Sequence, residues 1–509
     1  MERQTVYVLQ RALAVTAASA GRRVPLASAR LRAAPLILLL GCALVAGCGS
    51  NAHAKPASSP AAESLHTLAG FQPPALAITH AATRGVAPGL LFLAEKGGAS
   101  KPGGPVIADN RGRILWYLQL DHPLEATDFR TQTYRGKPVL TWWQGTISKA
   151  GIGRGEYEVY DRSYRKIATV KATKGLEGDL HEFQFTPRGT AYISIYHEVP
   201  ADLTSVGGPR DGWVYDSVIQ EIDVATGKVV FEWHSLDHVP LTESLQAGHE
   251  PAKHATKKHP LDYFHVNSIS DAPGGRILVS GRNTSAVYLL ARDGSIVWRL
   301  GGKRSDFGPP GAVKFRFQHN ARLHPGNVLT LFDNGAIPKV EPYSRALELK
   351  LDPKSKRASI VKAFVHPLKI SSPFEGNLQL LPDGGALVGW GGVRKVTEFT
   401  PAGKVRFEVK LPFGDTYRGY RLAWNGNPGD KPAIDVDAGH VFASWNGRLD
   451  IDHWDVLAGD DARHLAKVSA HPWTGLETDI ALADPPNAVA VRAVDAAGRV
   501  LGVSTTAHS

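Results

Sequence analysis

A repeated arrangement of short strands limits the folds open to this chain more than any other feature of its sequence. Each copy reads as a strand, a turn rich in Pro, Asp or Gly, a second strand, and then another pair of strands around a Gly turn. The strands alternate apolar and polar residues and are rich in Val, Ile, Leu and aromatic residues, as half-buried strands are. Six copies are expected, at residues 89–121, 136–172, 179–238, 262–302, 315–366 and 374–412. Units of four strands over roughly 40–55 residues are typical of β-propeller blades. The sequence therefore predicts an all-β protein with a six-bladed β-propeller over residues 79–430.

The pattern changes after the last repeat. Residues 435–509 contain short alternating strands without the spacing of the earlier turns. Trp445, Trp454 and Trp473 supply large side chains for a small core. We expect a compact C-terminal β-sandwich of the fibronectin or immunoglobulin type.

The N-terminus reads as a targeting signal. An Arg-rich leader precedes the apolar run PLILLLGCALVAG, which suits a signal peptide and is too short for a comfortable membrane span. The run ends in Val45-Ala46-Gly47-Cys48, which resembles the lipobox of bacterial lipoproteins. This resemblance implies that residues 1–47 are removed and that Cys48 is acylated. The protein would then be extracytoplasmic and lipid-anchored to the outer face of the cell membrane. A simple secretory signal with an incidental cysteine is the alternative.

Residues 48–78, rich in Ala, Ser and Pro after Cys48, are expected to form a flexible tether between the anchor and the propeller. The only other cysteine, Cys42, lies within the signal segment. The mature chain therefore has one cysteine, so an internal disulfide, thiol catalysis and a Cys-based metal site are all excluded.

The charge of the chain gives little sign of a nucleic-acid partner. The net charge is +10, and much of this excess lies in the Arg-rich leader. The rest of the sequence contains no dense run of Lys and Arg with interleaved aromatic residues. Binding to nucleic acid is therefore not expected.

Histidines recur at one position of the repeats. Aligning the copies on their turns places His181, His265 and His319 at the same early position of the first strand. In a propeller the first strand of each blade lines the central channel, so these side chains are expected to point into one channel. A single strand histidine is more often a structural residue, and it is the shared position that favours a functional site.

The second strand of each copy runs antiparallel to the first, so its end lies beside the start of the first strand. Those ends carry Arg282 and Asn334, and Asn267 follows His265 on the first strand. Polar groups should therefore gather at one end of the channel, provided that the register is right. Asn334 precedes Gly335, so turn chemistry is an alternative explanation of that residue.

Histidine, asparagine and arginine around a cavity that restricts water suit a substrate with a tetrahedral anionic group. Arginine offers a planar fork to two anionic oxygens, and a neutral histidine can act as a nucleophile or proton shuttle. Sulfuryl or phosphoryl transfer needs mainly positioning and stabilisation of the transferred group. No P-loop and no Gly-rich fingerprint on a βαβ unit is found, so neither a nucleotide donor nor any other cofactor is expected.

Several motifs resemble one family. The stretches DYFHVNSI, LVSGRNTSAVYLL, IVWRLGGKRSDF, FRFQHNARL and LTLFDNG are similar to those of the arylsulfotransferase (ASST) family of bacterial, extracytoplasmic propeller proteins. The similarity covers most of residues 80–430. It implies transfer of a sulfuryl group from a phenolic sulfate ester to a phenolic acceptor through a sulfurylated histidine, without a nucleotide donor. An aryl sulfate and a phenol are the small-molecule partners that follow from it.

The resemblance also implies roles for individual residues. His319 in the QH motif would be the nucleophile, and Arg282 would clamp the sulfate. His265 and Asn267 would contact the sulfuryl oxygens and the leaving group, with His265 a possible acid or base, and His181 would assist proton transfer. Asn334 is a further candidate for substrate binding. The chain departs from some relatives, because it cannot form their disulfide and because it carries a C-terminal sandwich.

Two other functions remain open at the level of sequence. A non-catalytic, surface-anchored propeller could use the same polar ring to bind an anionic or aromatic ligand. The three histidines could also hold Zn or Cu, although the neighbouring Arg282 disfavours a cation. The sequence does not indicate the oligomeric state.

Overall fold

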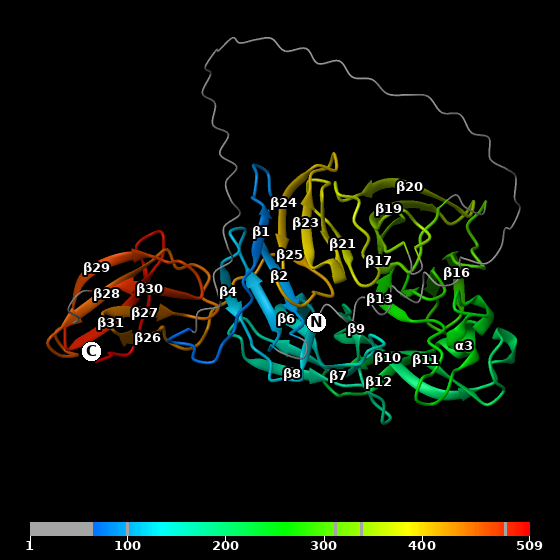
Figure 1. The fold of residues 1–509 in the computed structure, drawn as a ribbon, viewed down its shortest axis with the longest axis horizontal. Coiled ribbons are helices and arrows are strands. Elements are labelled where there is room, and N and C mark those ends of the chain that lie inside the picture. Colours follow the sequence, from blue (N-terminus) through cyan, green and yellow to red (C-terminus); the bar gives the residue numbers. More distant parts are fainter. Residues whose placement is uncertain (1–64, 98–100, 310–312, 336–338, 483–485, 509) are drawn as a thin grey trace, which may run out of the picture. The chain divides into compact units, whose positions relative to one another are not determined.

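The computed structural model describes residues 65–97, 101–309, 313–335, 339–482 and 486–508 (Figure 1). These residues form eight sheets, and every pairing between their strands is antiparallel. Helices in the described part of the chain are short: η1 (Thr204–Val206), α2 (Ser235–His238), η2 (Leu241–Glu243), α3 (Glu250–Lys253) and η3 (Gly391–Val393). The prediction of an all-β protein is therefore confirmed.

Four of the sheets consist of four consecutive strands each. The first contains β5 (Glu125–Tyr134), β6 (Lys137–Ile147), β7 (Gly153–Tyr160) and β8 (Lys166–Val170). The second contains β9 (Asp179–Phe185), β10 (Thr190–Ala201), β11 (Gly212–Asp223) and β12 (Val229–His234). The third contains β13 (Val266–Ala272), β14 (Arg276–Gly281), β15 (Ala286–Leu290) and β16 (Ile296–Gly301). The fourth contains β17 (His319–His324), β18 (Val328–Asp333), β19 (Arg345–Asp352) and β20 (Arg357–Phe364).

Two further sheets join segments that are far apart in the sequence (Figure 1). One contains β21 (Asn377–Leu380), β22 (Ala386–Gly389), β23 (Lys395–Phe399) and β24 (Val405–Lys410), with β1 (Ala77–His80) added beside β24. The other contains β2 (Leu90–Glu95), β3 (Gly104–Ala108) and β4 (Ile114–Tyr117), with β25 (Tyr420–Leu422) paired to β2. The first repeat of the sequence thus receives its fourth strand from the end of the repeat region.

Five of these sheets contact one another in succession through their first strands, and the sixth makes contacts through β25. The contacts run from β5 to β9, from β9 to β13, from β13 to β17 and from β17 to β21, and β25 contacts both β22 and β5. The pairings of β5, β9, β13 and β17 with their neighbouring strands each contain a register shift. Such bulges bend a strand and redirect side chains, and here they fall close to the residues of the candidate site.

The second repeat begins earlier than the sequence indicates. Its expected start was residue 136, whereas its first strand, β5, spans Glu125–Tyr134. The sequence of β5, EATDFRTQTY, is polar because Asp128 and Arg130 take part in a buried ionic cluster described below. A strand that buries charges in this way lacks the apolar alternation by which strands are recognised.

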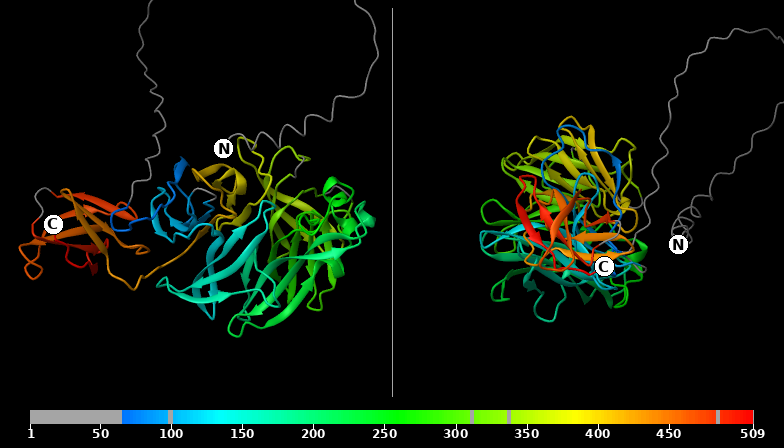
Figure 2. Two further views of the ribbon diagram at one scale, coloured as in Figure 1. Left: turned by 60° about the horizontal axis from the view of Figure 1, so that its bottom comes forward. Right: turned by 90° about the vertical axis from the view of Figure 1, so that its left-hand side faces the viewer.

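The C-terminal region forms two sheets that share one hydrophobic core. One contains β26 (Ala433–Asp437), β27 (His440–Ser444) and β30 (Glu477–Ala481). The other contains β28 (His453–Gly459), β29 (Ala466–Pro472), β31 (Ala488–Val494) and β32 (Val500–Val503). Trp445 and Trp454 are buried in this core, and Trp473 packs against it while its ring also stacks on Arg113. The strands of both regions have the twist usual for packed sheets (Figure 2).

Part of the expected tether makes contacts in the structure. Thr67 donates its backbone N–H to the Glu477 carboxylate at 2.7 Å, and Gln72 donates its backbone N–H to the Gln119 side chain at 2.7 Å. Cys48 and residues 1–47 lie outside the described residues. Within the part of the chain that the structure describes, no helix is both long and apolar enough to span a membrane.

Candidate active site

Three histidines gather where the first strands begin. The rings of His181 and His265 meet edge to face, with their centroids 4.8 Å apart. Tyr417 links this pair to the third histidine, because its ring centroid lies 5.5 Å from that of His181 and 6.3 Å from that of His319. All three imidazoles are buried, with 2–6% of each residue exposed. The histidines that the repeat alignment placed together therefore do lie around one centre.

Two of the histidines are held by carboxylates. Nδ1 of His181 lies 2.5 Å from Oδ2 of Asp179, and Nδ1 of His265 lies 2.5 Å from Oδ2 of Asp262. Asp179 is fixed in turn, since it also accepts the backbone N–H of Gly153 at 2.7 Å. A carboxylate can only accept a hydrogen bond from a ring nitrogen, so Nδ1 carries the proton in both rings. This leaves Nε2 as the nitrogen available for chemistry.

His319 is held by an amide instead of a carboxylate. Its Nδ1 lies 2.7 Å from Oδ1 of Asn334 and 3.1 Å from the backbone oxygen of Phe317. The amide of Asn334 donates to the backbone oxygens of Ser372 at 2.9 Å and Glu375 at 2.8 Å, which fixes Oδ1 toward the imidazole. Both neighbours of Nδ1 are thus acceptors, so Nδ1 carries the proton and Nε2 keeps its lone pair.

The surroundings of His319 keep it neutral. Burial, followed by the positive charge of Arg282, holds the pKa of His319 well below its usual value of 6.5. A carboxylate partner would have raised that pKa, and Asn334 binds Nδ1 without supplying a negative charge. An uncharged imidazole with a free Nε2 is the form that acts as a nucleophile.

Arg282 lies beside the histidines as an almost isolated charge. Its guanidinium stacks on the ring of Phe317 at 4.3 Å, and Nη1 donates to Oδ1 of Asn283 at 2.8 Å. Among the described residues no carboxylate oxygen lies within 4.0 Å of its nitrogens. Burial lowers its pKa, although arginine stays charged under ordinary conditions. A buried cation without an ion-pair partner is suited to an anionic ligand.

The side chains of Asn267 and Asn334 differ in whether a polar atom remains without a hydrogen-bond partner in the described residues. Asn267 is fully buried and donates to the backbone oxygen of Gln318 at 2.7 Å, while its Oδ1 has no hydrogen-bond partner in the described residues. Asn334 uses Oδ1 on His319 and both amide hydrogens on backbone carbonyls. In this structure Asn334 orients the nucleophile candidate, whereas Asn267 retains unused polar capacity.

A buried arginine that the sequence analysis missed lies next to the histidines. The guanidinium of Arg418 is 2.9 Å from Oδ1 of Asp128 and 3.2 Å from Oε2 of Glu182, and it donates to the backbone oxygens of His181 and Asn267. Glu182 is shared with Arg130 and Arg322, each at 2.6 Å. Burial alone would raise the pKa of Glu182, but the charges of these three arginines lower it.

Arg418 escaped detection because it precedes β25, which is short and shows no repeat pattern. The only signal was the aromatic and basic stretch TYRGYRL, which also resembles an ordinary loop. Tyr417 comes from the same stretch. The segment that completes the sheet of β2, β3 and β4 therefore also supplies the ring that contacts His181 and His319.

A second cluster of charged residues is connected to the site through a backbone hydrogen bond. Lys96 forms ion pairs with both Glu375 and Asp415, and the backbone oxygen of Glu375 holds the amide of Asn334. Burial, together with the charge of Asp415, raises the pKa of Glu375 to about 7 despite the presence of Lys96. Sequence reasoning missed this group as well, since its members come from three distant segments.

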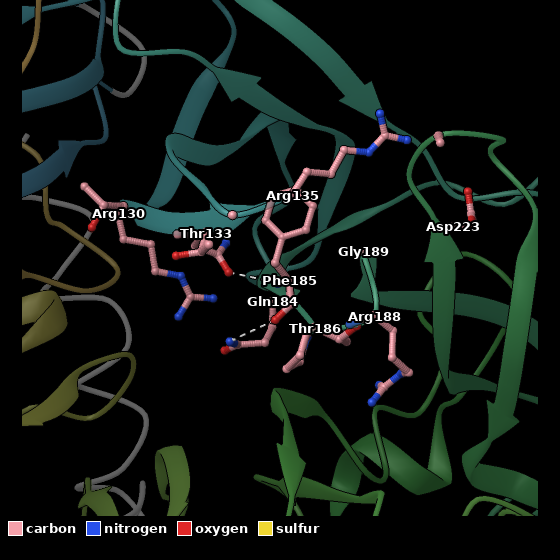
Figure 3. A pocket seen from close by; sticks show the side chains of 14 residues that line it. Arg130, Thr133, Arg135, Gln184, Phe185, Thr186, Arg188, Gly189 and Asp223 are labelled. Atoms are coloured by element: carbon pink, nitrogen blue, oxygen red, sulfur yellow. Dashed lines mark hydrogen bonds between the residues drawn. The ribbon is translucent and has the colours of Figure 1, made fainter.

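Other arrangements in the described residues lie apart from this site. Among the described residues, no group of three or more His, Cys, Asp or Glu side chains is placed to hold a metal ion. A cavity of about 650 Å³ is lined by the turns that join β5 to β6, β9 to β10 and β11 to β12 (Figure 3). These turns lie at the opposite ends of the strands from the histidines, and Arg130 and Arg188 in its lining are already paired with carboxylates.

The geometry defines an all-β protein in which three buried histidines, one of them neutral, lie together with a buried arginine that has no carboxylate partner in the described residues. The model of the arylsulfotransferase (ASST) family matches residues 130–411, which is more than half of the 509-residue chain. The chain therefore belongs to the arylsulfotransferase (ASST) family.

Comparisons with individual proteins add little to this assignment. No curated protein matches the chain. A solved structure of a protein of unknown function from Bacteroides caccae is similar, with 15% identity, a TM-score of 0.41, and coverage of 65% of this chain and 98% of the other. A virginiamycin B lyase from Staphylococcus aureus is also similar, with 12% identity, a TM-score of 0.29, and coverage of 72% and 94%. At these values neither structure carries an argument about function.

Proposed function

We propose that the protein transfers a sulfuryl group from a phenolic sulfate ester to a phenolic acceptor, with His319 as the covalent carrier. The observation that carries this proposal is the state of His319: its imidazole is neutral, its Nδ1 is fixed by Asn334, and its Nε2 keeps a lone pair beside Arg282. Membership of the arylsulfotransferase family supports an aryl sulfate as the donor and a phenol as the acceptor.

In the first half-reaction, Nε2 of His319 attacks the sulfur atom of the aryl sulfate. An N–S bond forms, the bond from sulfur to the aryl oxygen breaks, and the departing phenolate takes the Nε2 proton of His265 or His181, whichever ring carries protons on both nitrogens when the step begins. Arg282 binds the sulfuryl oxygens, where negative charge is concentrated. The donor leaves as a phenol, and His319 carries the sulfuryl group.

In the second half-reaction, the acceptor phenol gives its proton to the imidazole that protonated the first product. Its oxygen then attacks the sulfur atom, the N–S bond breaks, and His319 returns to its neutral form. No atom changes its oxidation state, so the reaction needs no redox partner. The aryl sulfate supplies the sulfuryl group, so it needs no nucleotide donor either. This is consistent with the lack of a phosphate-binding loop in the sequence.

We further propose that the six sheets built from β1 to β25 are the six blades of a β-propeller spanning residues 79–430. The succession of contacts between their first strands, and the pairing of β25 with β2, support a closed ring. The two C-terminal sheets with their common core support a β-sandwich over residues 435–509. The contacts of Thr67 and Gln72 favour a tether shorter than residues 48–78.

The N-terminal sequence supports an extracytoplasmic location. We propose that residues 1–47 are a lipoprotein signal peptide and that Cys48 is acylated, which would anchor the protein to the outer face of the cell membrane. Mass spectrometry of the protein purified from membranes tests this, because acylation adds a lipid to an N-terminal Cys48. A protein released in soluble form with an unmodified N-terminus would contradict the anchor.

A non-catalytic protein that binds anions is the second candidate function. The observation that favours it is Arg282, which is buried, has no carboxylate partner within the described part of the chain, and would attract an anion whether or not chemistry follows. Such a protein would bind an aryl sulfate and release it unchanged.

One experiment separates the two functions. The purified full chain is incubated with an aryl sulfate and a phenol, and the sulfated acceptor and the sulfurylated protein are measured by mass spectrometry. We expect His319→Ala to abolish both signals. His324→Ala is a matched control on the same strand, because the side chain of His324 hydrogen-bonds Thr330 at the far end of β17, and it should retain both. Binding of a broad panel of aryl sulfates without transfer would support the non-catalytic function.

A further inference from the structure

We propose that Asp262 and Asn283 are positioning residues that hold His265 and Arg282 as one unit against the sulfuryl group. This inference rests on the proposed sulfuryl transfer, because it concerns how two of the residues that would contact the substrate are oriented. Neither Asp262 nor Asn283 was singled out as part of the site by its sequence.

Asp262 fixes the ring of His265. Its Oδ2 lies 2.5 Å from Nδ1 of His265, and its Oδ1 is buried without a hydrogen-bond partner in the described residues. The carboxylate therefore makes one directed contact inside the site. That contact sets the tautomer of His265 and turns its Nε2 away from the carboxylate.

Asn283 connects the same segment to Arg282. Its Nδ2 donates to the backbone oxygen of Asp262 at 2.6 Å, and its Oδ1 accepts from Nη1 of Arg282 at 2.8 Å. The side chain is buried, so it bridges the two segments inside the protein. One face of the Arg282 guanidinium is stacked on Phe317, and Asn283 fixes its rotation about that face.

The backbones of the two segments are joined as well. Arg282 donates its N–H to the oxygen of His265 at 2.9 Å, and Asn283 donates its N–H to the oxygen of Phe264 at 3.0 Å. His265 itself adopts a φ of +59°, a conformation that residues with a side chain rarely take. Strained residues of this kind persist where their surroundings hold them and are concentrated at functional sites.

The charged groups around His265 determine how readily its imidazole is protonated. Asp262, His181 and Arg282 are the groups with the largest electrostatic effect on its imidazole. His319 also interacts with its charge, and Tyr196 packs against the ring at 5.4 Å. Burial lowers the pKa of His265, and Asp262 is the group that opposes this shift. Asp262 thus favours the protonated ring, which is the form able to protonate a departing phenolate.

The test compares Asp262→Asn, Asp262→Glu and a control variant in single-turnover sulfurylation with an aryl sulfate. Loss of the protonated ring should lower the rate roughly 10²-fold in Asp262→Asn, the order that a general acid contributes. The fall in rate with rising pH, which reflects His265, should move to lower pH. Asp262→Glu keeps the charge and should return this part of the profile toward that of the wild type.

Glu408→Gln is the matched control. Glu408 lies on β24, away from the first strands, and its buried carboxylate binds the buried ring of His366 at 2.7 Å. We expect this variant to lose stability without any shift of the pH profile. A uniform loss of rate at every pH in Asp262→Asn, as in a variant that is merely less folded, would overturn the role of Asp262.

Asn283→Ala tests the second half of the inference. Because Asn283 orients the residue that binds the sulfuryl oxygens, the KM for the aryl sulfate should rise while the pH profile keeps its position. An unchanged KM in a folded Asn283→Ala variant would remove Asn283 from the proposal.

A measurement without substrate separates failure of this inference from failure of the proposed function. In the ¹⁵N-labelled full chain, NMR should show a protonated Nδ1 on His265, assigned by its loss in His265→Ala, and an altered signal in Asp262→Asn. An unprotonated Nδ1 would contradict the positioning by Asp262 even in an active enzyme. Lack of transfer by the wild type would instead contradict the proposed function.

Discussion

The imidazole of His319 donates its Nδ1 proton to Oδ1 of Asn334, at a distance of 2.7 Å. The amide of Asn334 can adopt only one orientation, because both of its hydrogens are bound by backbone carbonyls. A neutral acceptor therefore fixes the tautomer of a buried histidine, and although this hydrogen bond favours the protonated ring, burial and Arg282 keep the pKa of His319 well below 6.5. The two neighbouring histidines bind a carboxylate through Nδ1 instead of an amide. This contrast indicates that the three rings have different chemical roles.

The first prediction concerns Asn334. We expect Asn334→Ala to lower the rate of sulfurylation about 10²-fold, because the ring of His319 would lose the contact that aligns Nε2 with the sulfur atom. The KM for the aryl sulfate should change far less than the rate, since Asn334 has no free polar group to offer the substrate. Single-turnover kinetics measure both quantities.

Asn377→Ala is the matched control for the removal of a buried amide. Asn377 exchanges hydrogen bonds with the backbone of Gly419 at the start of β21 and does not contact the histidines. Its loss should lower the melting temperature and leave the rate of transfer by the folded protein unchanged. If both asparagine variants lose the same fraction of activity, Asn334 has no specific role.

The second prediction concerns stability at acid pH. The pKa of His319 is well below 6.5 in the folded protein, so the unfolded chain binds more protons as the pH falls below 6.5. Stability must therefore fall with falling pH in this window. We expect His319→Asn to lose less stability than the wild type between neutral and mildly acidic pH. Chemical denaturation at two pH values measures the difference, and parallel losses in both proteins would contradict the buried neutral state.

The third prediction concerns Glu375, whose pKa moves in the opposite sense. Its pKa is raised from 4.5 to about 7, so the folded protein holds a proton there that the unfolded chain releases. Between these values, stability falls as the pH rises. Glu375→Gln removes this contribution, so the free energy of unfolding of the variant should fall less than that of the wild type over this pH range. A larger fall in the variant would show that Glu375 is ionised in the folded protein.

The sequence was sufficient to predict the all-β fold and the convergence of His181, His265 and His319. This was possible because strand repeats recur along the chain and place equivalent residues at equivalent positions. The repeats could not reveal Asp262, because it lies in the loop ahead of β13, and strand alternation gives no information about a loop residue. Nor could they show that Asn334 binds His319, since the same Asn-Gly pair is also typical of a turn.

Arg418 could not be identified from the repeats, and it is the subject of the last prediction. It is fully buried and satisfies Asp128 and Glu182, which come from the first strands of two other sheets. Loss of Arg418 leaves Asp128 and Glu182 with only Arg130 and Arg322 as ion-pair partners in the described residues, and it removes the hydrogen bonds of Arg418 to the backbone oxygens of His181 and Asn267. Removing one partner of a buried ion pair typically costs about 3–5 kcal/mol. We therefore expect Arg418→Leu to lower the free energy of unfolding by about 4 kcal/mol. Arg165→Ala, which breaks an exposed pair with Asp161, should cost less than about 1 kcal/mol. Denaturant unfolding measures both, and equal losses would mean that the central charges do not hold the first strands together.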